Sequence, residues 1–394
     1  MKDDKVEGAT MTNDRNGAGR QLIESELEEI EKEARVFVAS QWQLMWWKFR
    51  RHKLAVICGV LILLVYLVAI FAEFLAPYPT DAVFSQYTYA PPQRLHLFDH
   101  SQGLRFEPFV YDYTVEVDPE ALRREFTVDE TSKIRVGFFV EGEPYKLAGL
   151  IPASRHLVGS LDPEKPMFLL GADRLGRDLL SRLIYGTRIS VSIGLLGVFL
   201  SLLLGILLGG ISGYYGGWID NLIQRGIEFT RSLPTIPLWL GLAAALPEEW
   251  SALQVYFAIT VILSLVGWTS LARAIRGRFL ALRAEDFVLA AKLDGSSEFR
   301  IIVRHMLPAF MSHVIASITL AIPFMIIAET SLSFLGVGLR PPIVSWGTLL
   351  RAAQNVRAVA TAPWLLIPAI PVIVAVLALN YLGDGLRDAA DPYN

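Results

Sequence analysis

The sequence predicts an all-α membrane protein with six transmembrane helices, a polar elbow on the cytoplasmic side and a small α+β or β extracytoplasmic insert. Three observations lead to this fold class. The 394 residues are 53% hydrophobic, and their mean hydropathy is +0.41. Long runs almost free of charge alternate with short charged segments. Soluble domains rarely combine these properties, whereas helical membrane proteins require them.

The apolar runs are each long enough to cross a hydrocarbon layer of about 30 Å, which takes roughly 20 helical residues. Six runs qualify, at residues 54–76, 189–212, 218–246, 252–272, 309–337 and 363–383. Two prolines, Pro368 and Pro371, predict a kink in the last run. The single cysteine, Cys58, excludes an intrachain disulfide, and a formal net charge of -3 indicates no nucleic-acid role.

The segment before the first span, residues 1–53, is predicted to be cytoplasmic. Residues 1–20 have a composition typical of disorder, whereas 21–47 carry an approximate helical face of apolar residues. We interpret that helix as a solvated amphipathic segment, with a regulatory element as the alternative. Basic residues and tryptophans directly precede the first span, so the positive-inside rule places the N-terminus in the cytoplasm. Six spans then return the C-terminus to the same side.

Four arginines contradict this topology, because Arg174, Arg177, Arg182 and Arg188 precede the second span on its predicted outer side. Asp173 and Asp178 are close enough in sequence to pair with some of them. The insert at 78–168 also lies outside the membrane in this topology. Its segments 105–116 and 133–147 are rich in strand-forming residues, and 141–144 reads as a turn between strands.

The charged segment 283–308 forms the elbow, which lies between the fourth and fifth spans. Ala284, Phe287, Val288 and Ala291 share one helical spacing before Asp294-Gly295, and Phe299, Ile302, Val303 and Met306 repeat it afterwards. Gly295 permits a sharp bend with positive φ, and Ser296 is predicted to cap the second helix. A polar elbow on the aqueous side of a membrane protein indicates a docking surface for a soluble partner.

Polar residues inside apolar runs are candidates for a translocation path, because charge at membrane depth usually faces protein or water. The candidates are Glu228, Arg231, Glu329, Ser333 and Asn380. Within the third run, Arg225 is spaced to pair with Glu228, and Glu228 with Arg231. Two alternatives stay open. Asp220 and Arg225 either line the path or lie in the interface, and Glu329 either lines the path or is a satisfied structural carboxylate.

Small residues recur every four positions in the second run, at Gly197, Ser201, Gly205, Gly209 and Gly213. Residues four apart lie on one helix face, and such a face lets another helix approach closely. We interpret the stripe as packing within the subunit, with an interface between subunits as the alternative.

Signatures of catalysis are missing from the sequence. It contains no Gly-Lys dipeptide, hence no phosphate-binding loop of the Walker type, and no HExxH motif. His96 and His100 are four residues apart, but one such pair is a weak metal signal, so we predict no metal site and no catalytic residue. A membrane-embedded enzyme is therefore disfavoured. A receptor or scaffold that signals through the elbow is the alternative from a different functional class.

The elbow resembles the EAA loop of permease subunits of bacterial ATP-binding cassette (ABC) importers, which reads EAA, three residues, Gly, nine residues and I-x-L-P. Ala290, Ala291, Gly295 and Leu307-Pro308 match it, whereas Leu289 replaces the glutamate and His305 replaces the isoleucine. Residues 170–188, 213–220, 331–342 and 382–392 are similar to segments of the dipeptide/oligopeptide permease subfamily. The resemblance covers about 44–76 and 168–394, and the insert is longer than that subfamily usually carries.

The resemblance implies the type I importer fold, with residues 169–394 as the permease core, and transport of di- or oligopeptides across the bacterial inner membrane. Nickel chelates, glycosides and peptide antibiotics are the alternative substrates. It implies a homologous second permease subunit, two cytoplasmic ATP-binding subunits and an extracytoplasmic substrate-binding protein as partners, beside membrane lipid. ATP-Mg would bind to the partner subunits and no cofactor to this chain. The residues implied in ATPase coupling are Phe287, Leu289, Ala290, Ala291, Asp294, Gly295, Phe299, Ile302, His305, Leu307 and Pro308.

Overall fold

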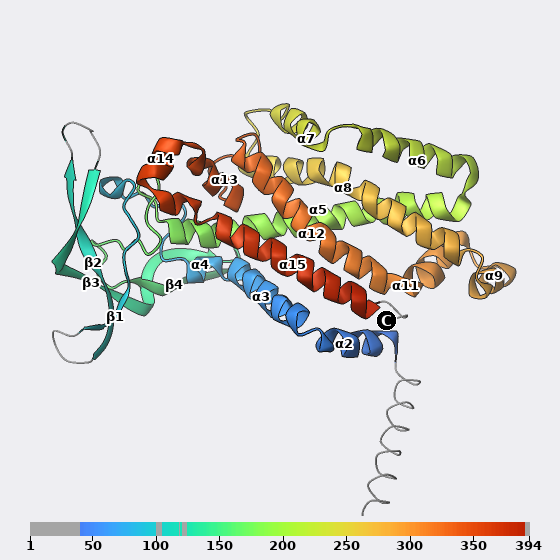
Figure 1. The fold of residues 1–394 in the computed structure, drawn as a ribbon, viewed down its shortest axis with the longest axis horizontal. Helices are drawn as coiled ribbons and strands as arrows, with labels where there is room; N and C mark the ends of the chain where they lie inside the picture. Colours follow the sequence, from blue (N-terminus) through green and yellow to red (C-terminus); the bar gives the residue numbers. More distant parts are fainter. Residues whose placement is uncertain (1–39, 100–104, 118, 120–123, 391–394) are drawn as a thin grey trace, which may run out of the picture.

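The computed structural model describes residues 40–390, apart from 100–104, 118 and 120–123. It consists of a bundle of long helices with a small β-sheet at one end and the elbow at the opposite end (Figure 1). The predictions for residues 1–20, for most of the helix at 21–47 and for His100 lie outside the described residues. The end of that helix overlaps α2 (Gln41–Arg51), which Ser40 caps with a capping box formed with Gln43.

Five helical segments of the described chain are long and apolar enough to span a membrane: Lys53–Ile70, Leu179–Tyr215, Ala252–Leu282, Val314–Phe334 and Pro363–Ala390. The predicted helical membrane fold is thereby confirmed, while the count of six spans stays a prediction. Before the sheet the helices are α3 (Lys53–Ile70) and α4 (Ala72–Leu75), followed by the short turn η1 (Ser85–Tyr87). After the sheet come α5 (Leu179–Tyr215), α6 (Gly217–Ser232), α7 (Thr235–Ala244) and α8 (Ala252–Leu282), and then the elbow with α9 (Asp286–Leu293), α10 (Glu298–Arg300), η2 (Ile301–Met306) and α11 (Leu307–Ala309). The chain ends with α12 (Met311–Phe334), α13 (Trp346–Leu350), η3 (Arg351–Gln354), α14 (Val356–Thr361), η4 (Pro363–Leu366) and α15 (Ala369–Ala390).

The predicted span 218–246 is not one continuous helix. It is divided into α6 and α7, and the break falls at Leu233, whose backbone is extended with ψ 135°. The cause is Pro234, because a proline disfavours the helical conformation of the residue before it and cannot donate a backbone hydrogen bond itself. α6 is polar on one side, whereas α7 is apolar but only 10 residues long.

Near Pro368 and Pro371, where a kink was predicted, the chain changes from a 3-10 turn to a regular helix. The last span starts as the 3-10 turn η4, and the regular helix α15 begins only at Ala369, after Pro368. Pro371 is thus the third residue of α15, in the first turn, where a missing N–H costs no intrahelical bond.

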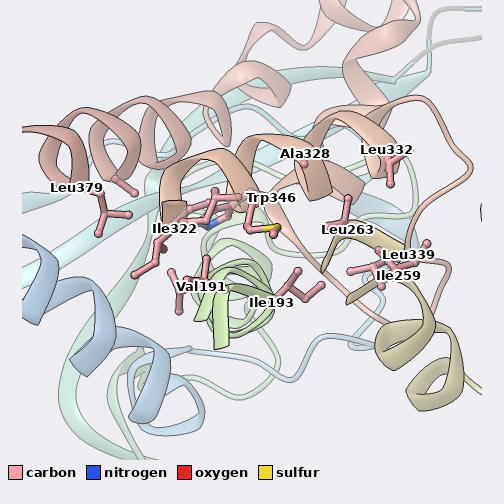
Figure 2. Packing of buried hydrophobic residues seen from close by; sticks show 14 of the residues in the cluster. Val191, Ile193, Ile259, Leu263, Ile322, Ala328, Leu332, Leu339, Trp346 and Leu379 are labelled. Atoms are coloured by element: carbon pink, nitrogen blue, oxygen red, sulfur yellow. The ribbon is translucent and has the colours of Figure 1, made fainter. Parts of the chain in front are cut away.

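The main hydrophobic core lies where α5, α8 and α12 cross and where α13 and α15 cover them (Figure 2). Trp346 from α13 is fully buried at its centre, and its indole Nε1 donates to the hydroxyl of Thr187 at 3.2 Å. Buried Ile193, Ile259 and Ile326 come from the three long helices. α3 packs on α15 but leaves most of its apolar surface exposed, as expected for a helix that faces lipid.

The predicted insert contains a four-stranded antiparallel sheet in the order β1-β2-β3-β4. The strands are β1 (His96–Asp99), β2 (Arg105–Val117), β3 (Arg124–Leu147) and β4 (Ile151–Ser160). The long β3 pairs with β2 up to Arg135 and with β4 from Val136 onwards. The expected strands at 105–116 and 133–147 are therefore present, and two further strands accompany them.

The turn predicted at 141–144 lies inside β3. The register against β4 shifts between Glu141 and Tyr145, so these residues form a bulge, where Pro144 needs no ladder partner. The actual turn follows at 148–150, where Ala148 and Gly149 have positive φ.

Short contacts fasten the sheet to the helical bundle. His156 of β4 lies with Nδ1 2.6 Å from the carbonyl oxygen of Ala76, which directly follows α4. The phenol of Tyr78 accepts a hydrogen bond from the backbone N–H of Met167 at 2.9 Å. The sheet end of the molecule therefore has fixed contacts with the end of the first membrane helix.

Candidate functional site: the elbow between α8 and α12

The bend of the elbow is a Schellman motif at the end of α9. Gly295 has φ +76°, as the sequence predicted, and its N–H donates to the carbonyl oxygen of Lys292 at 3.1 Å. The N–H of Ser296 reaches back to the carbonyl oxygen of Ala291, also at 3.1 Å. These two bonds satisfy carbonyl groups that the helix end leaves free, so the direction of the bend is fixed by hydrogen bonds. A Cβ at Gly295 would meet no atom within 4 Å.

The second half of the elbow begins one residue later than predicted. Ser297, not Ser296, caps it, and its hydroxyl accepts from the backbone N–H of Arg300 at 3.4 Å. Ser296 is already used in the Schellman motif. From Ile301 to Met306 the chain forms a wider π-helical turn, η2, before α11 leads into α12. Such turns are rare and are often found at functional sites.

The inner side of the elbow is part of a second hydrophobic core. Val288 and Ala291 of α9 and Ile301 and Met306 of η2 are buried together with Phe279 of α8. Phe310 and Val314 from the start of α12 complete this cluster. The elbow is therefore seated on the ends of two membrane helices, and a displacement of the elbow would be transmitted to both.

Polar contacts join the elbow to the end of α5. The phenol of Tyr215 donates to a carboxylate oxygen of Glu298 at 2.5 Å, and the ammonium group of Lys292 lies 5.2 Å from the ring centre of Tyr214. Next to these, the guanidinium of Arg276 in α8 makes two hydrogen bonds of 2.5 Å to Asp220 of α6. Two further helices, α5 and α6, thus have polar contacts at the elbow end of the bundle.

The outer side of the elbow exposes apolar side chains, which we call the outward strip. Leu293 is 90% exposed and Phe299 is 77% exposed, on the two sides of the bend. Exposed side chains of this size in one place usually mark an interaction surface. The members of the strip are Phe287, Leu289, Leu293, Phe299 and Val303.

The outward strip differs from the apolar face that the helical spacing defined in each half of the elbow. Val288, Ala291 and Met306 of that face are buried against the bundle of this chain. Sequence reasoning missed Leu293, because it lies off the face chosen by spacing. Its position one turn after Leu289 and directly before Asp294-Gly295 is the signal that would have found it.

The remaining residues implied in coupling are divided between the two sides. Ala290, Asp294 and Pro308 are exposed beside the outward strip. Ile302 and Leu307 are partly buried and pack on the inner cluster. His305 is half-buried in η2.

The candidates for a translocation path lie on three helices, α6, α12 and α15. Arg225 and Glu228 form the predicted pair at 2.9 Å, on an exposed face of α6. Arg231 instead donates to the hydroxyl of Ser270 in α8 at 3.1 Å. Asn380 is half-buried in α15.

Glu329 is a fully buried carboxylate held by three hydroxyl groups. Ser345 and Ser333 donate to it at 2.7 and 2.8 Å, and Ser190 donates at 3.4 Å. The oxygen of Ser190 in turn accepts from the backbone N–H of Trp346 at 3.0 Å. Of the two alternatives for Glu329, this geometry fits the structural one, since the carboxylate ties α12 to α5 and to the start of α13. The same applies to Ser333, whose hydroxyl also accepts from the N–H of Leu339 at 3.1 Å.

The small-residue stripe of α5 lies against α8 within this chain. A Cβ added at Gly209 would lie 2.4 Å from the carbonyl oxygen of Ala272, and one at Gly213 would lie 2.7 Å from that of Arg276. A Cβ added at Gly205 would lie 2.9 Å from the Cβ of Leu271. Further along, Ser201 donates to the carbonyl oxygen of Ser264 at 3.2 Å, and Gly197 faces Thr260 and Met325 at ordinary contact distance. The geometry fits packing within the subunit.

Three of the four arginines that contradicted the topology are held by acidic residues at the sheet end. Arg177 pairs with Asp173 at 2.7 Å, and Arg182 pairs with the same carboxylate. Arg188 pairs with Glu73 at 2.5 Å. Asp178, the second predicted partner, instead caps α5 by accepting from the N–H of Ser181 at 2.7 Å. Burial raises the pKa of the Asp178 carboxyl to about 6, although hydrogen bonds from Ser181 act in the opposite direction.

Groups of side chains that would suit a metal ion do not occur in the described residues, where three or more His, Cys, Asp or Glu never gather. His96 stacks on the ring of Phe109 with 5.1 Å between ring centres. That contact gives this histidine a packing role in the sheet.

Comparison with known proteins identifies the family. A family model described as the binding-protein-dependent transport system inner membrane component matches residues 202–393. A second model, the N-terminal transmembrane domain of oligopeptide transport permease C, matches residues 40–92. The dipeptide transport system permease protein DppC of Bacillus subtilis (strain 168) is 38% identical over 224 residues, which is 56% of this chain and 68% of that protein. The chain belongs to this family of ABC transporter permeases.

Another permease extends the match over nearly the whole chain. The glutathione transport system permease protein GsiD of Pectobacterium atrosepticum is 30% identical over 356 residues, 90% of this chain and 92% of that protein. A solved structure of the MetNI methionine ABC transporter aligns with 54% of this chain at 16% identity, but its TM-score of 0.43 is too low to support an argument. The two family models cover the elbow and α3 of this permease but not residues 93–201, which contain all four strands.

Proposed function

We propose that this chain is the membrane-spanning permease subunit of an ABC importer that moves di- or oligopeptides across the bacterial inner membrane. Membership of the permease family supports the role as the permease subunit of an ABC importer. The names of relatives, which transport dipeptides, oligopeptides and glutathione, support the substrate class. The chain itself would be non-catalytic. Two ATP-binding subunits would bind ATP and Mg²⁺ and supply the energy.

The elbow is the proposed contact with those subunits, and the outward strip is the single observation that carries this proposal. Its exposed apolar side chains sit on a bend that hydrogen bonds fix and that a buried core fastens to α8 and α12. A surface of this kind suits a groove in a partner protein, because burial of its side chains stabilises the complex. The contact needs no glutamate at Leu289, since it is apolar.

Movement of the elbow would then be coupled to the membrane helices. Closure of the ATP-binding subunits would displace the outward strip, and the inner cluster would transmit that displacement to α8 and α12. A second, homologous permease subunit would face this one across the path, and an extracytoplasmic binding protein would deliver the peptide. The nucleotide can shift the equilibrium between inward-open and outward-open states only through contacts that differ between the two.

This proposal also assigns the sides of the membrane. The elbow and both termini would be cytoplasmic, and the sheet would be extracytoplasmic at the opposite end of the bundle (Figure 1). The basic residues of the elbow and of α2 support this orientation by the positive-inside rule.

Uptake of a labelled dipeptide by cells that lack the gene tests both the substrate class and the coupling role of the elbow. The native chain is expected to restore uptake. Gly295→Val is expected to abolish it while the protein still inserts in the membrane, because φ +76° is unfavourable for a β-branched residue. The control is Gly295→Asn, which tolerates the same φ and should keep most of the uptake.

Two results would contradict the proposal. If the native chain restores no peptide uptake across a broad panel of di- and oligopeptides, the substrate class is wrong. If Gly295→Val transports as well as Gly295→Asn, the geometry of the elbow is not part of coupling.

A further inference from the structure

A cavity of about 410 Å³ opens at the sheet end of the bundle, away from the elbow. Its wall is built by the start of α5, the segment before it, the loop after α12, and the short helices α13, η3 and α14. Pockets that hold small molecules have volumes of roughly 300–1,000 Å³. The cavity is therefore large enough for one small ligand.

Four arginines line this cavity against one carboxylate. The arginines are Arg174, Arg177, Arg182 and Arg351, and the carboxylate is Asp173, which gives a formal excess of three positive charges. Among the described residues the lining contains no other acidic side chain. Three of these arginines are the ones that contradict the positive-inside rule, so simple topology does not account for them.

The ion pairs of the cavity leave donors free. Asp173 accepts from both Arg177 and Arg182, so one carboxylate serves two guanidinium groups. The Nε of Arg182 is buried and has no hydrogen-bond partner in the described structure. Arg174 and Arg351 form no ion pair with any described residue. The guanidinium of Arg351 lies over Gly336, where an added Cβ would be 2.9 Å from it.

Such an arrangement is unfavourable without an anion. Like charges around a small cavity repel one another, and a buried N–H without an acceptor loses the hydrogen bond that water would give it. A bound carboxylate would neutralise part of the positive charge and accept hydrogen bonds from the free N–H groups. A guanidinium presents two parallel N–H donors that match the two oxygens of a carboxylate. Apolar residues of the same lining, such as Leu339 and Leu365, can contact the rest of a ligand.

We propose that this cavity binds the terminal carboxylate of a peptide. The choice of a peptide as the carrier of that carboxylate rests on the proposed function, whereas the anion-binding character rests on the arginines alone. Bound in this way, a peptide would be selected by its charged end and not by its side chains, at the face of the permease opposite the elbow.

Direct binding to the purified transporter, without its soluble binding protein, tests this site. The probes are the dipeptide alanyl-phenylalanine and the same dipeptide with its carboxylate amidated. The free acid is expected to bind roughly tenfold or more tightly than the amide, because the amide offers no charge to the guanidinium groups.

Matched variants connect that preference to the cavity. Arg174→Gln and Arg351→Gln remove an exposed charge without breaking an ion pair, so both variants should fold, and each should weaken binding of the free acid by about tenfold. Arg357→Gln is the control. It removes another exposed arginine, which lies in α14 outside the cavity lining, and should leave binding unchanged.

The proposal is overturned if neither probe binds, if acid and amide bind equally, or if Arg174→Gln and Arg351→Gln behave like Arg357→Gln. These outcomes are separate from the uptake assay. A transporter that imports peptides but fails the binding test refutes the cavity site alone. Binding of the free acid by a transporter that imports no peptide refutes the proposed function alone.

Discussion

Removing the two most exposed side chains of the outward strip is expected to separate docking from folding. The double variant Leu293→Ser with Phe299→Ser changes side chains that are 90% and 77% exposed. Since they contact little of their own chain, we expect the free energy of unfolding to change by only about 0.5 kcal/mol. Insertion and purification should therefore be normal.

The effect on a partner is expected to be large. Burial of one leucine or phenylalanine contributes about 2 kcal/mol, so loss of both should weaken binding of an ATP-binding subunit by about 4 kcal/mol, or roughly a thousandfold. The measurement is the affinity of the purified ATP-binding subunits for the reconstituted permease, followed by peptide-stimulated ATP hydrolysis. Coupled hydrolysis should be lost together with binding.

Leu150→Ser is the matched control, because Leu150 is 82% exposed but lies in the turn after β3 at the other end of the molecule. It should bind the ATP-binding subunits like the native chain. Equal affinities for the double variant and for this control would refute the assignment of the outward strip.

Three further changes test the architecture of the helical bundle. Gly209→Ala places a methyl group 2.4 Å from a carbonyl oxygen of α8 and should destabilise the protein by about 1–3 kcal/mol in thermal unfolding, whereas Gly277→Ala, with nothing within 4 Å, should not. Ser345→Ala removes a 2.7 Å hydrogen bond to a buried carboxylate and should cost about 1–3 kcal/mol, whereas Ser331→Ala, which loses only a bond within its own helix, should be nearly neutral. The raised pKa of Asp178, about 6 in the fold, means that the folded state binds more protons than the unfolded state, so stability should fall as pH rises from about 4 to 6 and stay lower above it. Asp178→Asn should remove that dependence, and an unchanged pH profile would show that another group causes it.

The sequence predicted those parts of the molecule that depend on local pattern. Spans such as 54–76 and 252–272 follow from composition, because a helix in lipid must be apolar over its full length. The positive φ of Gly295 followed from two amphipathic halves that meet at a glycine. The Arg225–Glu228 pair followed from its spacing of three residues.

Tertiary structure decided the rest. Glu329 is satisfied by Ser190 and Ser345, which are 139 and 16 residues away, and no local pattern connects them. Hydropathy averaged over a window did not reveal the break at Pro234, since α7 is as apolar as a spanning helix. Which apolar side chains of the elbow are buried and which are exposed depends on packing against α8 and α12, and spacing in the sequence does not show it. For that reason Leu293 was found only in the structure.

The most direct test of the central claim is a crosslink from the outward strip. The chain has one cysteine, Cys58, and it is buried, so Leu293→Cys introduces a single accessible thiol. With a short thiol-specific crosslinker in native membranes, we predict a product of this chain with an ATP-binding subunit, and none from Leu150→Cys at the sheet end. A product from Leu150→Cys, or no product from Leu293→Cys in membranes that retain peptide uptake, would contradict the account.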